Sequence, residues 1–156
     1  MRHRLFVHLT WITRDRQPLI EVQRAEFLTR YLPSVARQER AEIWAMGLVT
    51  THVHLLIRLH PAADISRLAQ RFKGGSAVLA AREGHGPKDR PLHWAKGYDV
   101  QSVSPRALPD VTRYIQQQSS RHPGEAIPGW HNIPMTPPVS SLTVAEPRLE
   151  PRPGAF

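Results

Sequence analysis

Residues 52–60 read HVHLLIRLH, and the alternation within this stretch decides the fold. Apolar side chains occupy the odd-numbered positions from Val53 to Leu59, while His52 and His54 stand among the even-numbered ones. Successive side chains of a β-strand point to opposite faces of its sheet. We therefore predict a strand whose odd-numbered residues face a hydrophobic core and whose two histidines lie side by side on the other face.

The segments around this strand alternate between strand-like and helix-like patterns. Strand-like alternation or apolar runs occur in residues 4–13, 42–49 and 97–103, and helical spacing of apolar residues occurs in residues 21–39, 64–83 and 109–118. The run at 42–49 suits a central strand, and Pro33 is expected to kink or divide the first helix. The order β-α-β-β-α-β-α predicts an α+β fold, a ferredoxin-like antiparallel sheet with packed helices.

Proline marks the expected domain boundary. The chain has 156 residues, of which 40% are hydrophobic, and this is enough for one domain with a core of its own. Eight of the 15 prolines fall in residues 123–156, with few apolar residues between them. We predict a folded domain over residues 1–122 and a proline-rich C-terminal tail over 123–156 that is extended or disordered.

Composition excludes several classes of protein. The chain contains no cysteine, which rules out disulfide bonds, thiolate zinc sites and cysteine nucleophiles. No stretch approaches the ~18 consecutive apolar residues of a membrane span. We expect a cytoplasmic protein that makes no contact with a membrane.

The charge of the chain indicates a polyanionic partner. Its formal net charge is +8, and 18 of the 21 basic residues are arginine, which suits bidentate contact with phosphate. Residues 1–122 carry 19 basic and 10 acidic side chains, so the positive charge belongs to the predicted domain rather than to the tail. A basic surface that binds nothing is the alternative.

Two imidazoles held side by side on a strand are a ready pair of metal ligands, so His52 and His54 are candidates for a metal site. On its own the His-x-His pattern also fits two surface histidines on an open sheet face. Tyr114 and Gln118 lie four residues apart on the last predicted helix, on one face. The amide oxygen of Gln118 suits Mg²⁺ or Mn²⁺. If this helix packs over the two histidines, the three side chains could form one metal site beside the Tyr114 hydroxyl.

At this point the sequence resembles the single-tyrosine HUH transposases, most closely the REP-associated tyrosine transposase branch. The resemblance covers roughly residues 3–122, and the order and spacing of its blocks are more specific than any single block. The blocks are VHLTWITRDRQPL (7–19), HVHLLIRL (52–59), SRLAQRFKGGS (66–76), HWAKGYDVQSVS (93–104) and LPDVTRYIQQQ (108–118).

The resemblance implies a function for the site. It identifies His52 and His54 as the paired histidine ligands, Gln118 as the third ligand of Mg²⁺ or Mn²⁺, and Tyr114 as the nucleophile. Such enzymes bind hairpins in single-stranded DNA and cut beside them through a 5′-phosphotyrosine intermediate, as a monomer or a homodimer. One departure stands out: Thr51 occupies the position before the histidine pair, where the family usually has Asp or Asn.

Five basic residues are candidates for DNA binding. Arg14 and Arg16 follow the first strand, and Arg67, Arg71 and Lys73 lie on the second helix. Gly74 and Gly75 come directly after Lys73, and their lack of a side chain permits close approach of a phosphate backbone or of another helix.

Two other functions remain open at this stage. A catalytically weak or silent domain that binds single-stranded or hairpin DNA would keep the same fold and basic surface without needing a metal. A two-histidine phosphoesterase would carry two His-x-Ser/Thr motifs. His8-Leu9-Thr10 matches that motif once, but His54 replaces the second hydroxyl, and we rank this possibility last.

Overall fold

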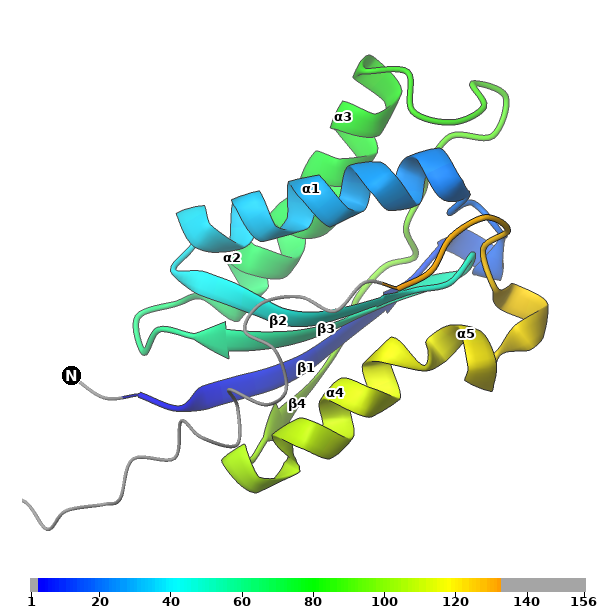
Figure 1. Cartoon of the computed structure of the whole chain (residues 1–156). Coiled ribbons are helices and arrows are strands. Elements are labelled where there is room, and N and C mark those ends of the chain that lie inside the picture. The colour runs from blue at the N-terminus through cyan, green and yellow to red at the C-terminus, as the bar shows by residue number, and fades with distance from the viewer. Residues whose placement is uncertain (1–2, 133–156) are drawn as a thin grey trace, which may run out of the picture.

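A four-stranded antiparallel sheet with helices packed on both faces forms the protein, as the computed structural model of residues 3–132 shows (Figure 1). The strand order across the sheet is β2-β3-β1-β4. The strands are β1 (Leu5–Ile12), β2 (Ala41–Leu48), β3 (His52–Leu59) and β4 (Asp99–Val103). The helices are α1 (Val22–Gln38), α2 (Ile65–Gln70), α3 (Ser76–Arg82), α4 (Leu108–Gln116) and α5 (Gln118–Arg121). The predicted α+β class and antiparallel sheet are confirmed.

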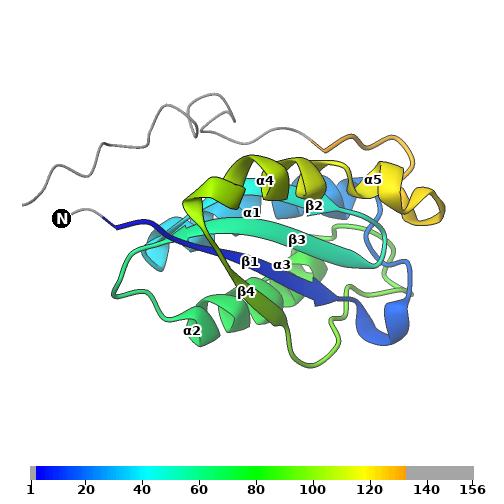
Figure 2. The same cartoon turned by 90° about the horizontal axis from the view of Figure 1, so that it is seen from below.

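The alternation of β1 and β3 separates two cores. Leu9, Leu55 and Ile57 belong to the larger core, which the sheet forms with α1, α2 and α3. Leu56, between two of these, belongs instead to a smaller core with Ile115 of α4. Figures 1 and 2 show the two layers, with α1, α2 and α3 on one face of the sheet and α4 and α5 on the other.

The apolar strand β2 lies at the edge of the sheet, so its predicted central position is wrong. Helix α1 packs against one face of β2 and helix α4 against the other. Ile43 and Met46 therefore enter the larger core while Trp44 and Ala45 enter the smaller one. Burial on both faces makes an edge strand as apolar as a central one.

The second predicted helix forms as two α-helices joined by a π-helical turn at Arg71–Gly75. The hydroxyl of Tyr31 on α1 donates to the carbonyl of Arg71 over 2.9 Å, and a side chain at Gly75 would overlap that hydroxyl. The close approach at Gly75 is therefore made by another helix. Helix α1 itself continues through Pro33, which was expected to kink or divide it.

The segment that follows α5 packs against the sheet as far as residue 132. The carbonyl of Glu125 accepts from the backbone N–H of Thr50 over 2.8 Å, and the side chain of Ile127 is buried. Asn132 accepts from the N–H of Leu48 over 2.9 Å. Residues 133–156 of the predicted tail lie outside the described residues.

Within residues 3–132, no helix has the length and apolar character needed to cross a membrane.

Candidate active site

Strands β1 and β3 and the last two helices bring the candidate residues together. Thr10 pairs with His54 and Ile12 with His52 in the antiparallel register of β1 and β3. Both histidines are buried, with 6% and 8% of their surfaces exposed, because α4 and α5 cover this face of the sheet. The predicted common face of His52 and His54 and the packing of the final helix over it are present in the structure.

Gly47 of β2 lets the last helices come this close. It pairs with His54 across β2 and β3. A Cβ atom at position 47 would overlap the backbone carbonyl of Ile115 and would lie 3.1 Å from Cγ of Gln118. The absence of a side chain at this one position therefore sets how near α4 and the start of α5 lie to the two histidines.

A hydrogen-bond chain fixes the tautomer of His52. The hydroxyl of Thr51 donates to Oε1 of Glu125 over 2.9 Å, and Nδ1 of His52 lies 2.9 Å from the same hydroxyl. A threonine hydroxyl has one proton, and since the carboxylate receives it, the hydroxyl oxygen accepts from Nδ1–H of His52. His52 therefore keeps its unprotonated lone pair on Nε2.

Gln118 turns its amide oxygen toward that lone pair. The amide nitrogen of Gln118 donates to the carbonyl of Tyr114 over 3.0 Å, which leaves Oε1 3.4 Å from Nε2 of His52. Gln118 is fully buried. Nε2 of His52 and Oε1 of Gln118 are thus two buried acceptors that face one another without a donor between them. A cation bound between them would interact favourably with both. Gln118 was expected on the same helix as Tyr114, but α4 ends at Gln116 and Gln118 is the first residue of α5.

His54 is held by β1. Its Nδ1 lies 2.8 Å from Nε2 of His8 and 3.0 Å from the hydroxyl of Thr10. These contacts occupy the Nδ1 side of the ring and orient Nε2 as the nitrogen that remains for another partner.

The imidazoles of His8, His52 and His54 each have a lowered pKa and favour their neutral form. Burial lowers the pKa of His54 to about 3, with smaller contributions from the nearby His52, His8 and His122. Burial is also the main cause of the lowered pKa of His52 and of His8. Metal binding requires a neutral imidazole, and these rings are therefore in the correct state at neutral pH.

Tyr114 lies at the exposed rim of the site. Its ring centroid is 5.9 Å from that of His54 and 6.1 Å from that of His8, in edge-on geometry, and 36% of the residue is exposed. The guanidinium of Arg121 lies 4.7 Å from the centre of the Tyr114 ring. The phenol is thus next to the imidazoles, open to a large substrate and accompanied by a positive charge.

The donor set fits a hard divalent cation. The described residues hold no group of three His, Cys, Asp or Glu side chains arranged for a metal, so a purely acidic or thiolate site is absent from this part of the chain. His52 and His54 with the amide oxygen of Gln118 offer two nitrogens and one oxygen, and Mg²⁺ or Mn²⁺ bound there would keep open positions for water and phosphate oxygens.

The five basic residues predicted to bind DNA lie in two places. Arg16 is near enough to His52 for its charge to lower that pKa, and Arg14 is exposed beside it. Arg67 and Arg71 form ion pairs with Glu39 at 3.1 and 2.9 Å on the opposite side of the sheet. Lys73, also on that side, donates to the carbonyls of Ala95 and Gly97, each over 2.7 Å. The site is therefore adjacent to only two of the five.

Four residues of the site were missed by the sequence reasoning. Glu125 and His122 fell within or beside the segment predicted as a tail, and His122 stacks edge-on against His52 with ring centroids 5.4 Å apart. Arg121 stood out only as one of many arginines. Gly47 carried the clearest signal, since glycine inside an apolar strand indicates close approach of another chain segment.

Comparison with known proteins gives a consistent result. The family described as "Transposase IS200 like" matches residues 1–118. A crystal structure of a candidate transposase from Deinococcus radiodurans R1 is 27% identical, with a TM-score of 0.58, and the match covers 76% of this chain and 93% of that one. A REP-associated tyrosine transposase bound to a REP hairpin is similar in fold, with 17% identity, a TM-score of 0.61, and coverage of 78% of this chain and 72% of that one. No protein of curated function matches the chain significantly.

Proposed function

This chain belongs to the IS200-like transposase family, and from that membership we propose that it is a metal-dependent, single-stranded DNA endonuclease and strand transferase. It is an HUH-type single-tyrosine enzyme that cleaves beside DNA hairpins through a covalent 5′-phosphotyrosine intermediate. The hairpin is proposed as the substrate because a similar fold, the REP-associated transposase, is described bound to one.

One observation carries the proposal. Nε2 of His52 and Oε1 of Gln118 lie 3.4 Å apart, while the ring of Tyr114 packs against His54, a second nitrogen donor on the same face. Phosphodiester cleavage requires a nucleophile beside a cation site, because the nucleophile attacks the same phosphate group whose negative charge the cation neutralises.

In the proposed reaction, Oη of Tyr114 attacks the phosphorus of the scissile phosphodiester and loses its proton to solvent. The bond from phosphorus to the 3′ oxygen breaks, and that oxygen takes up a proton to become a free 3′-hydroxyl. The 5′-phosphate stays on the tyrosine, so a 3′-hydroxyl can later attack it and rejoin the strand without an external energy source. Mg²⁺ or Mn²⁺ held by His52, His54 and Gln118 would act as a Lewis acid and neutralise charge on the phosphoryl oxygens.

The protein's own side chains set the geometry. His52, His54 and Gln118 would hold the cation, and Arg121 over the tyrosine ring brings a guanidinium toward the phosphate under attack. Arg14 and Arg16, at the end of β1, would contact the DNA backbone. His52, His54, Gln118 and Tyr114 all come from one chain, so we propose that a single copy can carry out cleavage.

The test is incubation of the protein with an end-labelled stem-loop oligonucleotide and Mn²⁺, followed by a denaturing gel. The wild type is expected to give a protein-linked product, and Tyr114→Phe is expected to abolish it while stem-loop binding persists. Tyr98→Phe is the matched control, because Tyr98 is similarly exposed but its hydroxyl lies 3.2 Å from that of Ser66 on the other side of the sheet.

Other outcomes identify the other functions. Cutting that persists in Tyr114→Phe would indicate hydrolysis by water, as in a two-histidine phosphoesterase. A wild-type protein that binds stem-loop DNA but never forms the adduct would be a silent binding domain.

A further inference from the structure

Different neighbours orient the two histidines that are proposed to bind the cation. The hydroxyl of Thr51, which donates to Glu125, accepts from Nδ1–H of His52. His54 instead lies against β1, where its Nδ1 is 2.8 Å from Nε2 of His8. For His54, a third imidazole therefore takes the place that the Thr51 hydroxyl has for His52.

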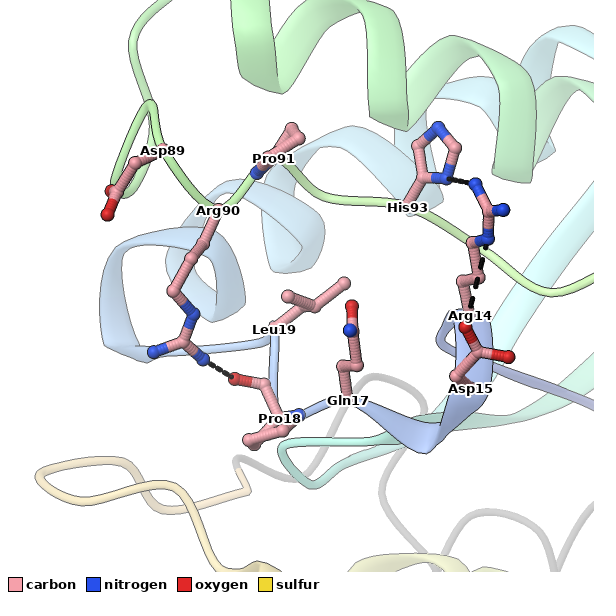
Figure 3. A pocket seen from close by; sticks show the side chains of 9 residues that line it. All are labelled: Arg14, Asp15, Gln17, Pro18, Leu19, Asp89, Arg90, Pro91 and His93. Atoms are coloured by element: carbon pink, nitrogen blue, oxygen red, sulfur yellow. Dashed lines mark hydrogen bonds and ion pairs between the residues drawn. The ribbon is translucent and has the colours of Figure 1, made fainter.

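The contacts of His8 belong to the covered face of the sheet and not to the surface hollow at the end of β1. Figure 3 shows this hollow, with Arg14 on one side and Arg90 on the other. The hollow has a volume of about 600 Å³, and none of His8, His54 and Tyr114 lines it. A substitution at His8 therefore acts on the candidate active site without altering the lining of the hollow.

Three polar atoms meet where His8 contacts His54. The hydroxyl of Thr10 lies 3.0 Å from Nδ1 of His54 and 3.3 Å from Nε2 of His8. Between two neutral imidazoles in contact, one nitrogen carries the proton and the other accepts it. If Nδ1 of His54 carries the proton, Nε2 of His54 keeps the lone pair that a cation needs. If Nε2 of His8 carries it, the proton of His54 is on its own Nε2 and blocks the cation.

Burial favours the first of these two arrangements. In the first, the remaining N–H group is Nδ1–H of His8, and in the second it is Nε2–H of His54. His8 is half-buried, whereas His54 is only 8% exposed. A buried N–H group without an acceptor is costly, while water can satisfy an N–H group on a partly exposed ring. The proton between the two rings is therefore assigned to Nδ1 of His54.

His8 also contacts the proposed nucleophile. Its ring meets the ring of Tyr114 edge-on, with centroids 6.1 Å apart, and the ring of His54 meets Tyr114 in the same way at 5.9 Å. Edge-to-face contact is a favoured geometry for aromatic rings. Tyr114 is 36% exposed, so these two imidazoles limit how far its ring can tilt toward the sheet.

We propose that His8 is a positioning residue with two separable actions: Nε2 of His8 holds His54 in the tautomer that can bind a cation, and the ring of His8 holds Tyr114 in place. The inference rests on the proposed function of the site. His8 acts through a ligand and through the nucleophile, and it touches neither the cation nor the phosphate.

The first action is tested in metal-free protein, without any measurement of activity. Nitrogen NMR at mildly alkaline pH distinguishes protonated from unprotonated ring nitrogens. Nδ1 of His54 is expected to carry the proton in the wild type. In His8→Phe the hydroxyl of Thr10 is free to donate to Nδ1 of His54, so the proton should move to Nε2. A proton on Nε2 of His54 in the wild type, or a tautomer that does not change in His8→Phe, would overturn this action.

Two variants separate the actions. His8→Phe keeps a ring beside Tyr114 but has no acceptor, so the Mn²⁺ affinity measured by calorimetric titration should fall by about 10- to 100-fold. Its rate of tyrosine–DNA adduct formation at saturating Mn²⁺ should stay close to that of the wild type. His8→Gln keeps an acceptor but has no ring, so it should retain the Mn²⁺ affinity and lose up to about 100-fold in the rate at saturating Mn²⁺.

His60→Phe is the matched control. It makes the same change beyond the other end of β3, where the ring of His60 meets that of His3. It is expected to leave the tautomer of His54, the Mn²⁺ affinity and the adduct rate unchanged. Urea unfolding of every variant shows that the protein is folded under the assay conditions.

The failure of this inference differs from the failure of the proposed function. A wild type that forms the adduct while His8→Phe and His8→Gln both match it, or both lose affinity and rate equally, overturns the two actions of His8 and leaves the proposed catalysis intact. A wild type that never forms the adduct overturns the catalytic proposal. In that case the tautomer and the Mn²⁺ affinity still decide whether His8 orients His54.

Discussion

Gly47→Ala is the substitution that most directly tests how the site is built. The added methyl group would overlap the backbone carbonyl of Ile115, which cannot rotate away as a side chain could. The C-terminal end of α4 must then move by roughly an ångström to restore ordinary contact. Tyr114 and Gln118 move with it, away from His52 and His54. We expect a stability loss of about 1–3 kcal/mol from overpacking.

The effect on activity should be larger than the effect on stability. A displacement of about 1 Å between reacting groups can reduce a rate roughly 100-fold. The rate of tyrosine–DNA adduct formation at saturating Mn²⁺ measures this, and the free energy of unfolding by urea is measured on the same samples. A protein that remains folded at the assay temperature but forms the adduct about 100-fold more slowly is the expected result.

Gly74→Ala is the matched control. Nothing lies within 4 Å of a Cβ atom at that position, and Gly74 is helical, so alanine should be neutral or stabilise the protein by up to about 1 kcal/mol. An adduct rate in Gly47→Ala equal to that of the wild type would refute the reasoning, because it would mean that the spacing of α4 from β3 does not set the geometry of the site.

Two further predictions concern the histidines. Glu125→Ala frees the hydroxyl of Thr51 to donate to Nδ1 of His52, and the ring proton of His52 then moves to Nε2. Because Nε2 is the proposed metal-binding nitrogen, the Mn²⁺ affinity measured by calorimetric titration should fall by about 10- to 100-fold. An unchanged affinity would contradict the assigned tautomer. In metal-free protein, His54 has a pKa of about 3 when folded, well below its ordinary value of 6.5, so the unfolded chain binds more protons and stability falls as the pH drops below about 6.5. At pH 5 this residue alone should cost about 2 kcal/mol in urea unfolding relative to pH 7, and His54→Ala should remove that part of the pH dependence; a wild-type stability independent of pH would contradict it.

The faces of the sheet could be predicted because they follow from local alternation. His52, His54 and Leu56 alternate along β3 with residues of the larger core, and a strand in any antiparallel sheet would place the two sets on opposite faces in the same way. The position of β2 could not be predicted in this way. The apolar run of β2 indicates only that both faces of the strand are buried. Helix α4, which covers the second face, begins about 60 residues later in the chain. An apolar sequence pattern indicates that a residue is buried, but it does not indicate which strand or helix covers that residue.

The environment of His52 shows the same limit at the scale of single atoms. The resemblance to the HUH transposases marked Thr51 as a departure, because those enzymes usually have Asp or Asn before the histidine pair. In the structure a carboxylate is present, supplied by Glu125 from 74 residues along the chain, and it reaches His52 through the Thr51 hydroxyl. The Thr51 hydroxyl transmits the effect of the carboxylate: it donates its one proton to Glu125, and its oxygen can then only accept a hydrogen bond from Nδ1–H of His52. The segment predicted as a tail after residue 122 therefore contributes to the orientation of a candidate metal ligand, and the domain that forms the site must extend at least to Glu125.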